Sequence, residues 1–230
     1  MKTILETRNL THEYKIGNNP FIRKKHQSLN GISIRVNQGD CLGVIGRNGS
    51  GKTTLLRILT GIYRLTSGSM KIDDECNPTL LTIGLGFKPE LSGRDNALIS
   101  CMLYGLDKST AVKLLPKIQE TAELGKFFHE QIKTYSTGMI SKLGFATAME
   151  TDIDLLLLDE VMSVGDISFS KKASALITKK IKSSLTVVIS SHNLDHISEL
   201  CNKTLWLHEG SQVEFGKTDE ILDKYKKFNE

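Results

Sequence analysis

The chain has 230 residues, of which 39% are hydrophobic and 24% charged, and its formal net charge is +4. These values are typical of a soluble globular protein with a full core, either one large α/β domain or a domain with a subdomain. The charge is too mild to favour nucleic acid, so we predict no nucleic-acid partner, although docking near an anionic membrane face is compatible with it. The four cysteines lie far apart without a C-x-x-C pair, which predicts a reducing cytosol rather than a disulfide framework or a zinc site.

The N-terminus lacks the apolar run of a signal peptide, and no run approaches the roughly 18 apolar residues of a membrane span. Any membrane association is therefore expected to come through a partner. The first predicted strand covers Thr3–Leu10, and the basic segment Lys15–Gln27 is interpreted as a loop. Apolar and polar residues alternate over Leu29–Val36, which predicts a half-buried strand.

The stretch Gly46–Thr53 carries two glycines with four residues between them, followed by Lys and Thr. The apolar segment Cys41–Ile45 before it predicts a buried strand, and the helical spacing of apolar residues over Thr54–Leu59 predicts a helix. This context directs backbone N–H groups and a helix dipole at one anion. Lys52 is expected to reach the terminal phosphates and Thr53 to hold Mg²⁺; the alternative is a glycine-rich turn without function. The predicted nucleotide-binding residues here are Gly46, Arg47, Asn48, Gly49, Ser50, Gly51, Lys52, Thr53 and Thr54.

The second half of the chain alternates helical and strand patterns. Apolar residues recur at helical spacing from about 92 to 149, which predicts a mainly helical insertion in an α/β core. Two apolar runs separated by a helical segment then predict buried parallel strands with right-handed crossovers. The predicted elements are strands at Asp154–Asp159 and Leu185–Ser191, a helix at Ser170–Lys182, a hairpin at Thr204–Leu207 and Gln212–Phe215, and a last helix after Thr218.

Asp159 and Glu160 end the first of these buried strands. Adjacent carboxylates at a strand end can have different roles. Asp159 is expected to bind Mg²⁺ and Glu160 to polarise the attacking water. An acidic surface pair is the alternative. His192, at the end of the next strand, can hydrogen-bond a phosphate oxygen or the water, or serve a structural role. Its spacing to His196 also suits zinc, but the intervening sequence lacks the glutamate of a metalloprotease motif.

The segment Tyr135-Ser136-Thr137-Gly138-Met139 precedes an amphipathic run, Ile140–Met149. A polar, glycine-containing helix start is a second candidate anion site. By itself this pattern is weak, because such helix starts are common, but it lies shortly before the acidic strand.

These elements, in this order, resemble the nucleotide-binding subunit of ABC transporters. Gly46–Thr53 is similar to the Walker A motif of that family, Leu155–Glu160 to Walker B and its catalytic glutamate, and His192 to the switch histidine. Tyr135–Met139 looks like a variant of the signature motif, and Ser163, Val164, Gly165 and Asp166 match the D-loop. The resemblance implies a P-loop NTPase core with a parallel sheet, an antiparallel β subdomain, and a helical signature subdomain inserted at about 92–149. The whole chain, 1–230, would be a single nucleotide-binding domain.

The segment Gly84–Asn96 and the Tyr-Ser-Thr-Gly-Met signature further resemble ATPases of polysaccharide exporters for O-antigen, capsule or teichoic acid. The usual Q-loop glutamine after the predicted Ile83–Phe87 strand is missing, and Lys88 or Glu90 is its possible replacement. Tyr14 is our choice for the aromatic residue that stacks on adenine, with His12 as the alternative and a core tyrosine as the other interpretation.

The resemblance implies a mechanism and partners. Two copies would close head to tail on two ATP molecules, each γ-phosphate meeting Walker A of one copy and Ser136 and Gly138 of the other. Hydrolysis with Glu160 and His192, ATP and Mg²⁺ would drive a separate transmembrane permease subunit through the groove beside Phe87–Arg94. The chain would sit peripherally on the cytoplasmic side of the plasma membrane, and the complex would move a lipid-linked polysaccharide.

Two other classes remain as alternatives. A soluble ABC-type mechanical ATPase acting on ribosomes or DNA usually has two cassettes or a long coiled-coil arm, which we do not find. A GTPase would need a guanine-binding Asn-Lys-x-Asp, whereas Asn202-Lys203-Thr204-Leu205 lacks the aspartate. The chain ends soon after its cassette, so we expect any glycan-binding domain to be absent or on another chain. The exported glycan is not specified by the sequence. The role of the basic segment Arg23–His26 is open: Arg23, Lys24 and Lys25 face either solvent, an anionic lipid headgroup or the diphosphate-linked glycan at the channel entrance.

Overall fold

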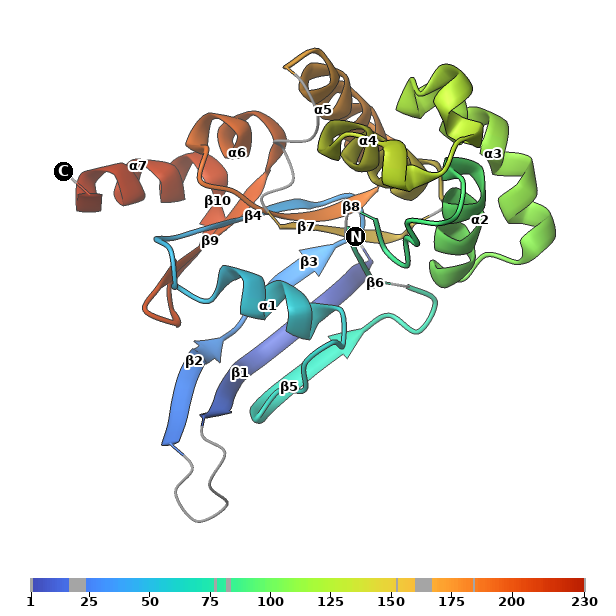
Figure 1. Ribbon diagram of the computed structural model, residues 1–230. Helices are drawn as coiled ribbons and strands as arrows, with labels where there is room; N and C mark the ends of the chain where they lie inside the picture. The colour runs from blue at the N-terminus through green and yellow to red at the C-terminus, as the bar shows by residue number, and fades with distance from the viewer. Residues whose placement is uncertain are drawn as a thin grey trace. The chain divides into compact units, whose positions relative to one another are not determined.

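The structure is a computed structural model that describes residues 2–16, 24–76, 78–81, 84–151, 153–159, 167–183 and 185–229. The chain divides into two compact units, each of which is described by itself (Figure 1). Unit 1 consists of Met1–Leu80, Asp154–Glu160 and Lys180–Glu230. Unit 2 consists of Leu81–Ile153 and Val161–Lys179.

Unit 1 is built on one mixed sheet, which has ten strands within the described ranges. The strand order is β3-β1-β2-β10-β9-β4-β8-β7-β6, and β5 pairs with β1 off this path. The parallel strands are β4 (Cys41–Ile45), β6 (Pro78–Leu80), β7 (Leu155–Asp159), β8 (Thr186–Ser190) and β9 (Lys203–His208). The antiparallel part contains β1 (Thr3–Ile16), β2 (Lys24–Ile32), β3 (Arg35–Asn37) and β5 (Ser67–Ile72), and β10 (Ser211–Lys217) pairs antiparallel with β9.

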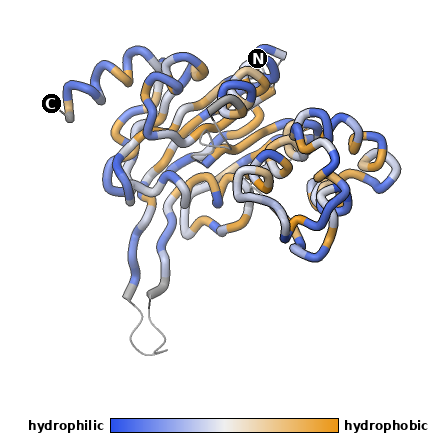
Figure 2. Tube along the Cα trace, turned by 45° about the horizontal axis from the view of Figure 1, so that its top comes forward, coloured by the Kyte–Doolittle hydropathy of each residue, from blue (hydrophilic) through white to orange (hydrophobic). Residues whose placement is uncertain are grey.

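The central parallel strands β4, β7 and β8 are mostly apolar, and they are buried on both faces. Every residue of β4 and β8 is buried, as expected for strands covered on both sides. Helix α1 (Lys52–Leu59) buries Leu55, Leu56, Ile58 and Leu59 in the same core. Helices α6 (Leu194–Leu200) and α7 (Thr218–Asn229) follow β8 and β10, and the tube of α7 near the C-terminus is mostly blue in Figure 2.

The N-terminal hairpin is longer than the sequence predicted. Strand β1 continues to Ile16 and β2 begins at Lys24, so the described part of the predicted loop Lys15–Gln27 pairs as an antiparallel ladder in Figure 1. The polar residues of this segment show no hydrophobic alternation that would predict a strand. Main-chain hydrogen bonds between β1 and β2 order it instead. The predicted strand Leu29–Val36 is divided between β2 and β3. Its four apolar residues, Leu29, Ile32, Ile34 and Val36, are all buried.

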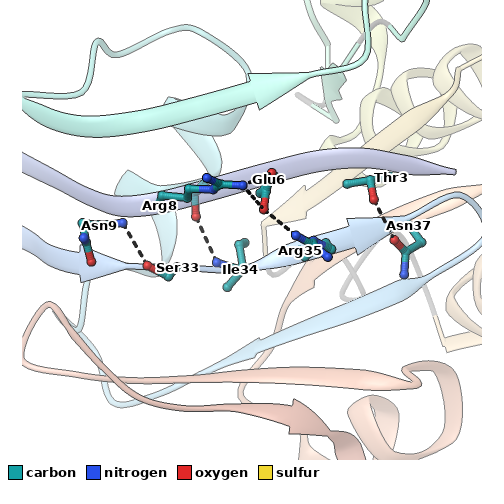
Figure 3. A network of polar contacts seen from close by, with 9 residues as sticks. Thr3, Glu6, Arg8, Asn9, Ser33, Ile34, Arg35 and Asn37 are labelled. Carbon is teal, nitrogen blue, oxygen red and sulfur yellow. Dashed lines mark hydrogen bonds and ion pairs between the residues drawn. The ribbon is translucent and has the colours of Figure 1, made fainter.

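Charged and polar side chains join β1 to the β2–β3 segment (Figure 3). Glu6 accepts hydrogen bonds from Arg35 at 2.8 Å and from Arg8 at 3.2 Å. The bond from Arg35 is the main reason why the pKa of Glu6 is lowered. The Asn9 N–H donates to the Ser33 hydroxyl at 2.9 Å, so this edge of the sheet is fixed by side chains as well as by its ladder.

Unit 2 is mainly helical. Its helices are α2 (Gly93–Leu103), α3 (Lys108–Ala122), the 3₁₀ helices η1 (Gly125–His129) and η2 (Ile132–Thr134), α4 (Thr137–Glu150) and most of α5 (Ile167–Lys182). Its core includes Ala97, Cys101, Ile118, Phe128 and Leu143. Among the described residues, no helix has the length and apolar content needed to cross a membrane.

The strand predicted at Ile83–Phe87 is wrong. The strand of this region is β6 at Pro78–Leu80, and Gly84–Gly86 forms a turn. Gly84 and Gly86 have φ angles of 76° and 73°, a left-handed conformation that a continuous strand does not contain. The apolar residues around these glycines had suggested a strand that the backbone does not form.

An ion pair between the buried Asp40 and the half-buried Lys203 anchors the start of β4, and it predicts a dependence of stability on pH. The Asp40 carboxylate accepts from Lys203 Nζ at 2.7 Å, Asn202 Nδ2 at 2.8 Å and the Asn37 N–H at 2.7 Å. Burial acts to raise the pKa of Asp40, but these three donors outweigh it and lower the pKa. Because the folded pKa is depressed, the stabilisation is complete above the unfolded value of about 3.9 and is lost as the pH falls through the folded value.

Replacing Asp40 by Asn should therefore lower the free energy of unfolding at pH 7 by about 1 to 3 kcal/mol, since Lys203 loses its buried counter-charge. Urea unfolding measured from pH 7 to pH 3 should also show a shallower acid-side decline for this variant. Asp73→Asn is the control, because Asp73 has a lowered pKa but pairs with the more exposed Lys2. Equal losses in the two variants would contradict the assignment.

Candidate nucleotide-binding site

The phosphate loop follows β4 directly, and its shape depends on two glycines. Gly46 has a φ of 150°, and a Cβ there would lie 2.3 Å from the Leu207 carbonyl oxygen and 2.5 Å from Ser50 Oγ. Gly51 has a φ of 97°, and its Cβ would lie 2.7 Å from the Ser28 carbonyl oxygen. The loop therefore packs its backbone closely against β9 and β2, which is possible only without side chains at these positions.

Lys52 is buried at the first position of α1. Its ammonium donates to the carbonyl oxygens of Gly46 at 2.9 Å and Arg47 at 3.2 Å, which holds Nζ against the loop. Ser50 Oγ is buried without a hydrogen-bond partner in the described part of the chain. A buried cation, an orphaned hydroxyl and a glycine cradle at a helix start fit a polyphosphate.

Strand register brings the predicted acidic and histidine residues to the same edge of the sheet as this loop. Val44 pairs with Ser190, and Ser190 pairs with Asp159, so these residues stand side by side on β4, β8 and β7. Adjacent strands are about 4.8 Å apart, which places Asp159 about two strand spacings from β4. The loop begins two residues after Val44, and His192 follows Ser190 by two residues. Carboxyl ends of parallel strands are where ligands bind in open α/β sheets.

Asp159 is half-buried, and its Oδ1 accepts a hydrogen bond from Ser190 Oγ at 2.5 Å. Asp159 and the half-buried Thr53 offer the hard oxygen ligands that Mg²⁺ prefers. In proteins, Mg²⁺ is usually bound by one or two carboxylates together with phosphate oxygens. No cluster of three His, Cys, Asp or Glu suited to a metal occurs among the described residues. Glu160, the predicted catalytic residue, lies outside the described residues, as does the predicted D-loop segment Ser163–Asp166.

His192 is exposed in the short turn between β8 and α6. The next residue, Asn193, caps α6 by accepting from the N–H groups of Asp195 and His196 at 2.9 and 3.3 Å. The two histidines thus lie on different elements, as the sequence predicted. The capped start of α6 fixes the position of His192 just after β8. At this position the imidazole can contact a ligand bound at this edge of the sheet.

Tyr14 comes from β1, and its hydroxyl lies 3.0 Å from the Thr54 hydroxyl in the first turn of α1. The alternative, His12, is buried: its ring stacks on Tyr63 at 5.7 Å, and its Nδ1 lies 2.9 Å from the Arg64 carbonyl oxygen. Tyr14 meets the His12 ring edge-on at 4.8 Å and remains half-buried. Of the two candidates, Tyr14 is therefore the more accessible and lies beside α1, the helix that follows the phosphate loop, whereas His12 is buried.

Within unit 2, the predicted signature segment combines a buried anchor with an exposed helix start. Tyr135 is buried, its hydroxyl donates to the Phe127 carbonyl oxygen, and burial raises its pKa to about 12. Ser136 caps α4 by accepting from the Met139 N–H at 3.2 Å. Ser136 and Thr137 are exposed, and Gly138 and Met139 are half-buried. Only the part after Tyr135 is thus open to a ligand.

Sequence reasoning missed the residue that organises the segment Phe87–Arg94. Asn96 is fully buried, accepts from the Lys88 N–H at 2.6 Å, and donates to the carbonyl oxygens of Lys88, Leu91 and Ser92. Main-chain bonds tie the same segment to residues 130–133, where Ile132 N donates to Leu91 O. The two candidate Q-loop replacements, Lys88 and Glu90, are both exposed. An asparagine in a helix gives no sequence signal for this role.

The residues considered for guanine recognition have structural partners instead. Asn202 Nδ2 and Lys203 Nζ both bind Asp40, and Asn202 Oδ1 accepts from the Cys41 N–H at 2.8 Å. Asn202 and Lys203 therefore join β4 to β9. Because these two side chains are bound to Asp40 and β4, they are not available to bind guanine, which counts against the GTPase alternative.

Comparison with known proteins agrees with this geometry. The family model described as "ABC transporter" matches residues 29–163. The O-antigen export system ATP-binding protein RfbB of Klebsiella pneumoniae is 36% identical over 88% of this chain and 82% of its own length. The teichoic acids export ATP-binding protein TagH is 37% identical in Shouchella clausii and 35% in Bacillus anthracis, each over 96% of this chain. The chain spans 62% of the former protein and 42% of the latter.

Solved structures show the same fold at low sequence identity. A dimeric ATP-binding cassette in a post-hydrolysis state with ADP and Pi has a TM-score of 0.78, with 19% identity over 94% of this chain and 99% of its own. An ATP-binding subunit of an ABC transporter has a TM-score of 0.79, with 19% identity over 97% of this chain and 93% of its own. The fold is thus a P-loop NTPase core with a parallel sheet, an antiparallel β part and a helical part. From its matched residues and its relatives, the chain belongs to the ABC transporter family of ATP-binding proteins.

Proposed function

We propose that this chain is the ATP-hydrolysing subunit of an exporter that moves a lipid-linked polysaccharide of O-antigen, capsule or teichoic acid type across the cytoplasmic membrane. The observation that carries the proposal is the common sheet edge of the phosphate loop, Asp159 and His192. The names of the relatives at 35 to 37% identity support the exporter branch. The chain works peripherally on the cytoplasmic side with a separate transmembrane permease.

In this proposal the phosphate loop holds ATP, with Lys52 at the terminal phosphates and Thr53 and Asp159 as the ligands of Mg²⁺. Bound by these two residues, Mg²⁺ would neutralise charge on the phosphates. Glu160 orients and deprotonates the attacking water, and His192 hydrogen-bonds the γ-phosphate or that water. Most of the rate then comes from positioning and charge stabilisation.

A second copy of the chain completes the site. Ser136 and Gly138 of one copy contact the γ-phosphate held by the other, and the D-loop Ser163–Asp166 crosses the same dimer interface. The exposure of Ser136 and Thr137 supports this assignment, as does the dimer formed by a cassette with the same fold. We assign 1–230 as one nucleotide-binding domain with its helical subdomain at about 92–149.

We further propose that the permease contacts the segment Phe87–Arg94, with Lys88 or Glu90 at the position of the missing glutamine. Its hydrogen bonds to Asn96 and to residues 130–133 support this proposal, because a contact made there moves with the chain just before Tyr135. Movement of the permease would thereby reach the signature segment through the hydrogen bonds that join Phe87–Arg94 to residues 130–133.

The proposal is tested by co-expressing the chain with candidate integral membrane proteins from the same genome. The expected result is a detergent-stable complex that hydrolyses ATP in preference to GTP, with Glu160→Gln binding ATP normally but turning over at least about a hundred-fold more slowly. Export of the polysaccharide to the cell surface should require both chains. Binding to ribosomes or DNA in place of the membrane protein would support the mechanical ATPase instead.

The assignment of Tyr14 to adenine gives a separate prediction. Tyr14→Ala should weaken ATP binding by about five-fold to 150-fold, because aromatic stacking on a base is worth about 1 to 3 kcal/mol. Tyr14→Phe keeps the ring and loses only the contact with Thr54, so its affinity should stay within about three-fold of wild type. Titration with a fluorescent ATP analogue measures both. Equal weakening in the two variants would assign the effect to the hydroxyl contact with Thr54 rather than to stacking.

A further inference from the structure

Two cysteines distant in sequence meet beside the start of β4. Cys41 Sγ and Cys201 Sγ lie 3.3 Å apart, although 160 positions separate them in the chain. Cys41 is 2% exposed and Cys201 is 7% exposed. The phosphate-site geometry uses neither thiol.

The backbone around this pair is fixed on both sides. Asn202 N donates to Cys41 O at 3.0 Å, and Cys41 N donates to Asn202 Oδ1 at 2.8 Å. Helix α6 packs so closely on β4 that a Cβ at Gly43 would lie 2.7 Å from Ile197 and 3.3 Å from Cys201 Sγ. The backbones that carry the two cysteines are therefore held close together, and the side chains alone have to move for the sulfurs to bond.

One of the two cysteines lines a cavity. A cavity of about 630 Å³ is bounded by the end of α6, the start of β9, the end of β10 and the start of α7, with Cys201, Lys203, Phe215 and Lys217 among its lining residues. Cys41 does not line it. A molecule of the size of water or a small peroxide can thus approach Cys201, and Cys41 lies directly behind it.

We propose that Cys41 and Cys201 form an oxidation site, in which a small peroxide reacts at Cys201 and Cys41 resolves the product as an intrachain disulfide. The Cys201 sulfur attacks one peroxide oxygen, the O–O bond breaks, and sulfenic acid and one water form. The Cys41 sulfur then attacks the sulfenic sulfur, a second water leaves, and the S–S bond forms. Two thiols are oxidised, and one peroxide is reduced to two waters.

The geometry sets the order of these steps. The sulfurs need to approach by about 1.3 Å to reach the disulfide length of about 2.0 Å, a movement within the range of side-chain rotation. The contact with Cys201, together with burial, raises the pKa of Cys41. Cys201 lines the cavity and Cys41 does not, so a peroxide meets Cys201 first.

The experiment treats the purified folded chain with hydrogen peroxide and maps its peptides by mass spectrometry under non-reducing conditions. The expected product is a Cys41–Cys201 cross-link two hydrogens lighter than the reduced pair, reversible by dithiothreitol. Because the closed loop is long, the melting temperature of the oxidised chain should rise by about 5 to 10 °C. Cys76 and Cys101, the other free thiols, are internal references.

The single variants separate the two roles. In Cys41→Ser the sulfenic acid on Cys201 has no resolving thiol, so a dimedone adduct should accumulate there, whereas wild type should give little. Cys201→Ser should give neither adduct nor cross-link. Absence of the cross-link in folded wild type, or equal dimedone labelling of Cys201 with and without Cys41, would overturn the proposal. Neither readout requires ATP, so the result is independent of the proposed export function.

Discussion

Replacing Lys52 by methionine is expected to lower the rate of ATP hydrolysis by at least about a hundred-fold. Methionine keeps most of the buried stem but removes the ammonium that stands against the loop carbonyls of Gly46 and Arg47. Loss of one positioned charge at a reacting phosphate commonly costs about 10² to 10³ in rate. Affinity for ATP should fall as well, because the same charge meets the phosphates before reaction.

The fold should survive this change. Hydrogen bonds to a charged donor contribute about 1.5 to 3 kcal/mol, and burying the apolar methionine side chain offsets part of their loss. Circular dichroism and thermal melting should therefore show a folded protein, so that phosphate release reports on chemistry. Lys113→Met is the matched control, because Lys113 is exposed on α3 and takes no part in the site. Wild-type turnover in Lys52→Met would remove Lys52 from the proposed mechanism.

The parts of the fold that sequence predicted are those in which a local pattern and its burial coincide. The apolar runs of β4, β7 and β8 are buried on both faces, and the glycine-containing stretch after β4 forms the loop expected of it. The hairpin of β9 and β10 and the last helix were also predicted within a few residues. In each case the local sequence contains the cause of the structure.

The errors lie where order comes from distant partners. The ladder between the polar ends of β1 and β2 cannot be inferred from hydrophobic alternation. Asn96 looks like an ordinary helix residue, yet its four hydrogen bonds shape the loop before α2. The sequence also gives no sign that the Tyr135 ring is buried and that its hydroxyl binds a main-chain carbonyl. Such roles depend on which segments meet in three dimensions.

Glycine substitutions in the phosphate loop should separate steric demand from conformational strain. Gly46→Ala is expected to lower the free energy of unfolding by about 3 kcal/mol or more and to abolish measurable ATP binding. Its Cβ would lie 2.3 Å from the Leu207 carbonyl oxygen, a backbone atom that cannot move without shifting β9. The loop would have to leave β9 to make room, which displaces the N–H groups that face the phosphates.

Gly49→Ala is the matched control within the same loop. Gly49 also has a left-handed φ, 79°, but a Cβ there meets no atom within 4 Å. Its cost should be the strain of a left-handed alanine alone, about 1 to 2 kcal/mol. Urea unfolding and ATP titration of both variants give the comparison. Equal destabilisation would mean that strain, and not contact with β9, requires glycine at Gly46. A clearly larger loss at Gly46 is expected, because a Cβ there meets the Leu207 carbonyl oxygen and because alanine adopts a φ of 150° less readily than one of 79°.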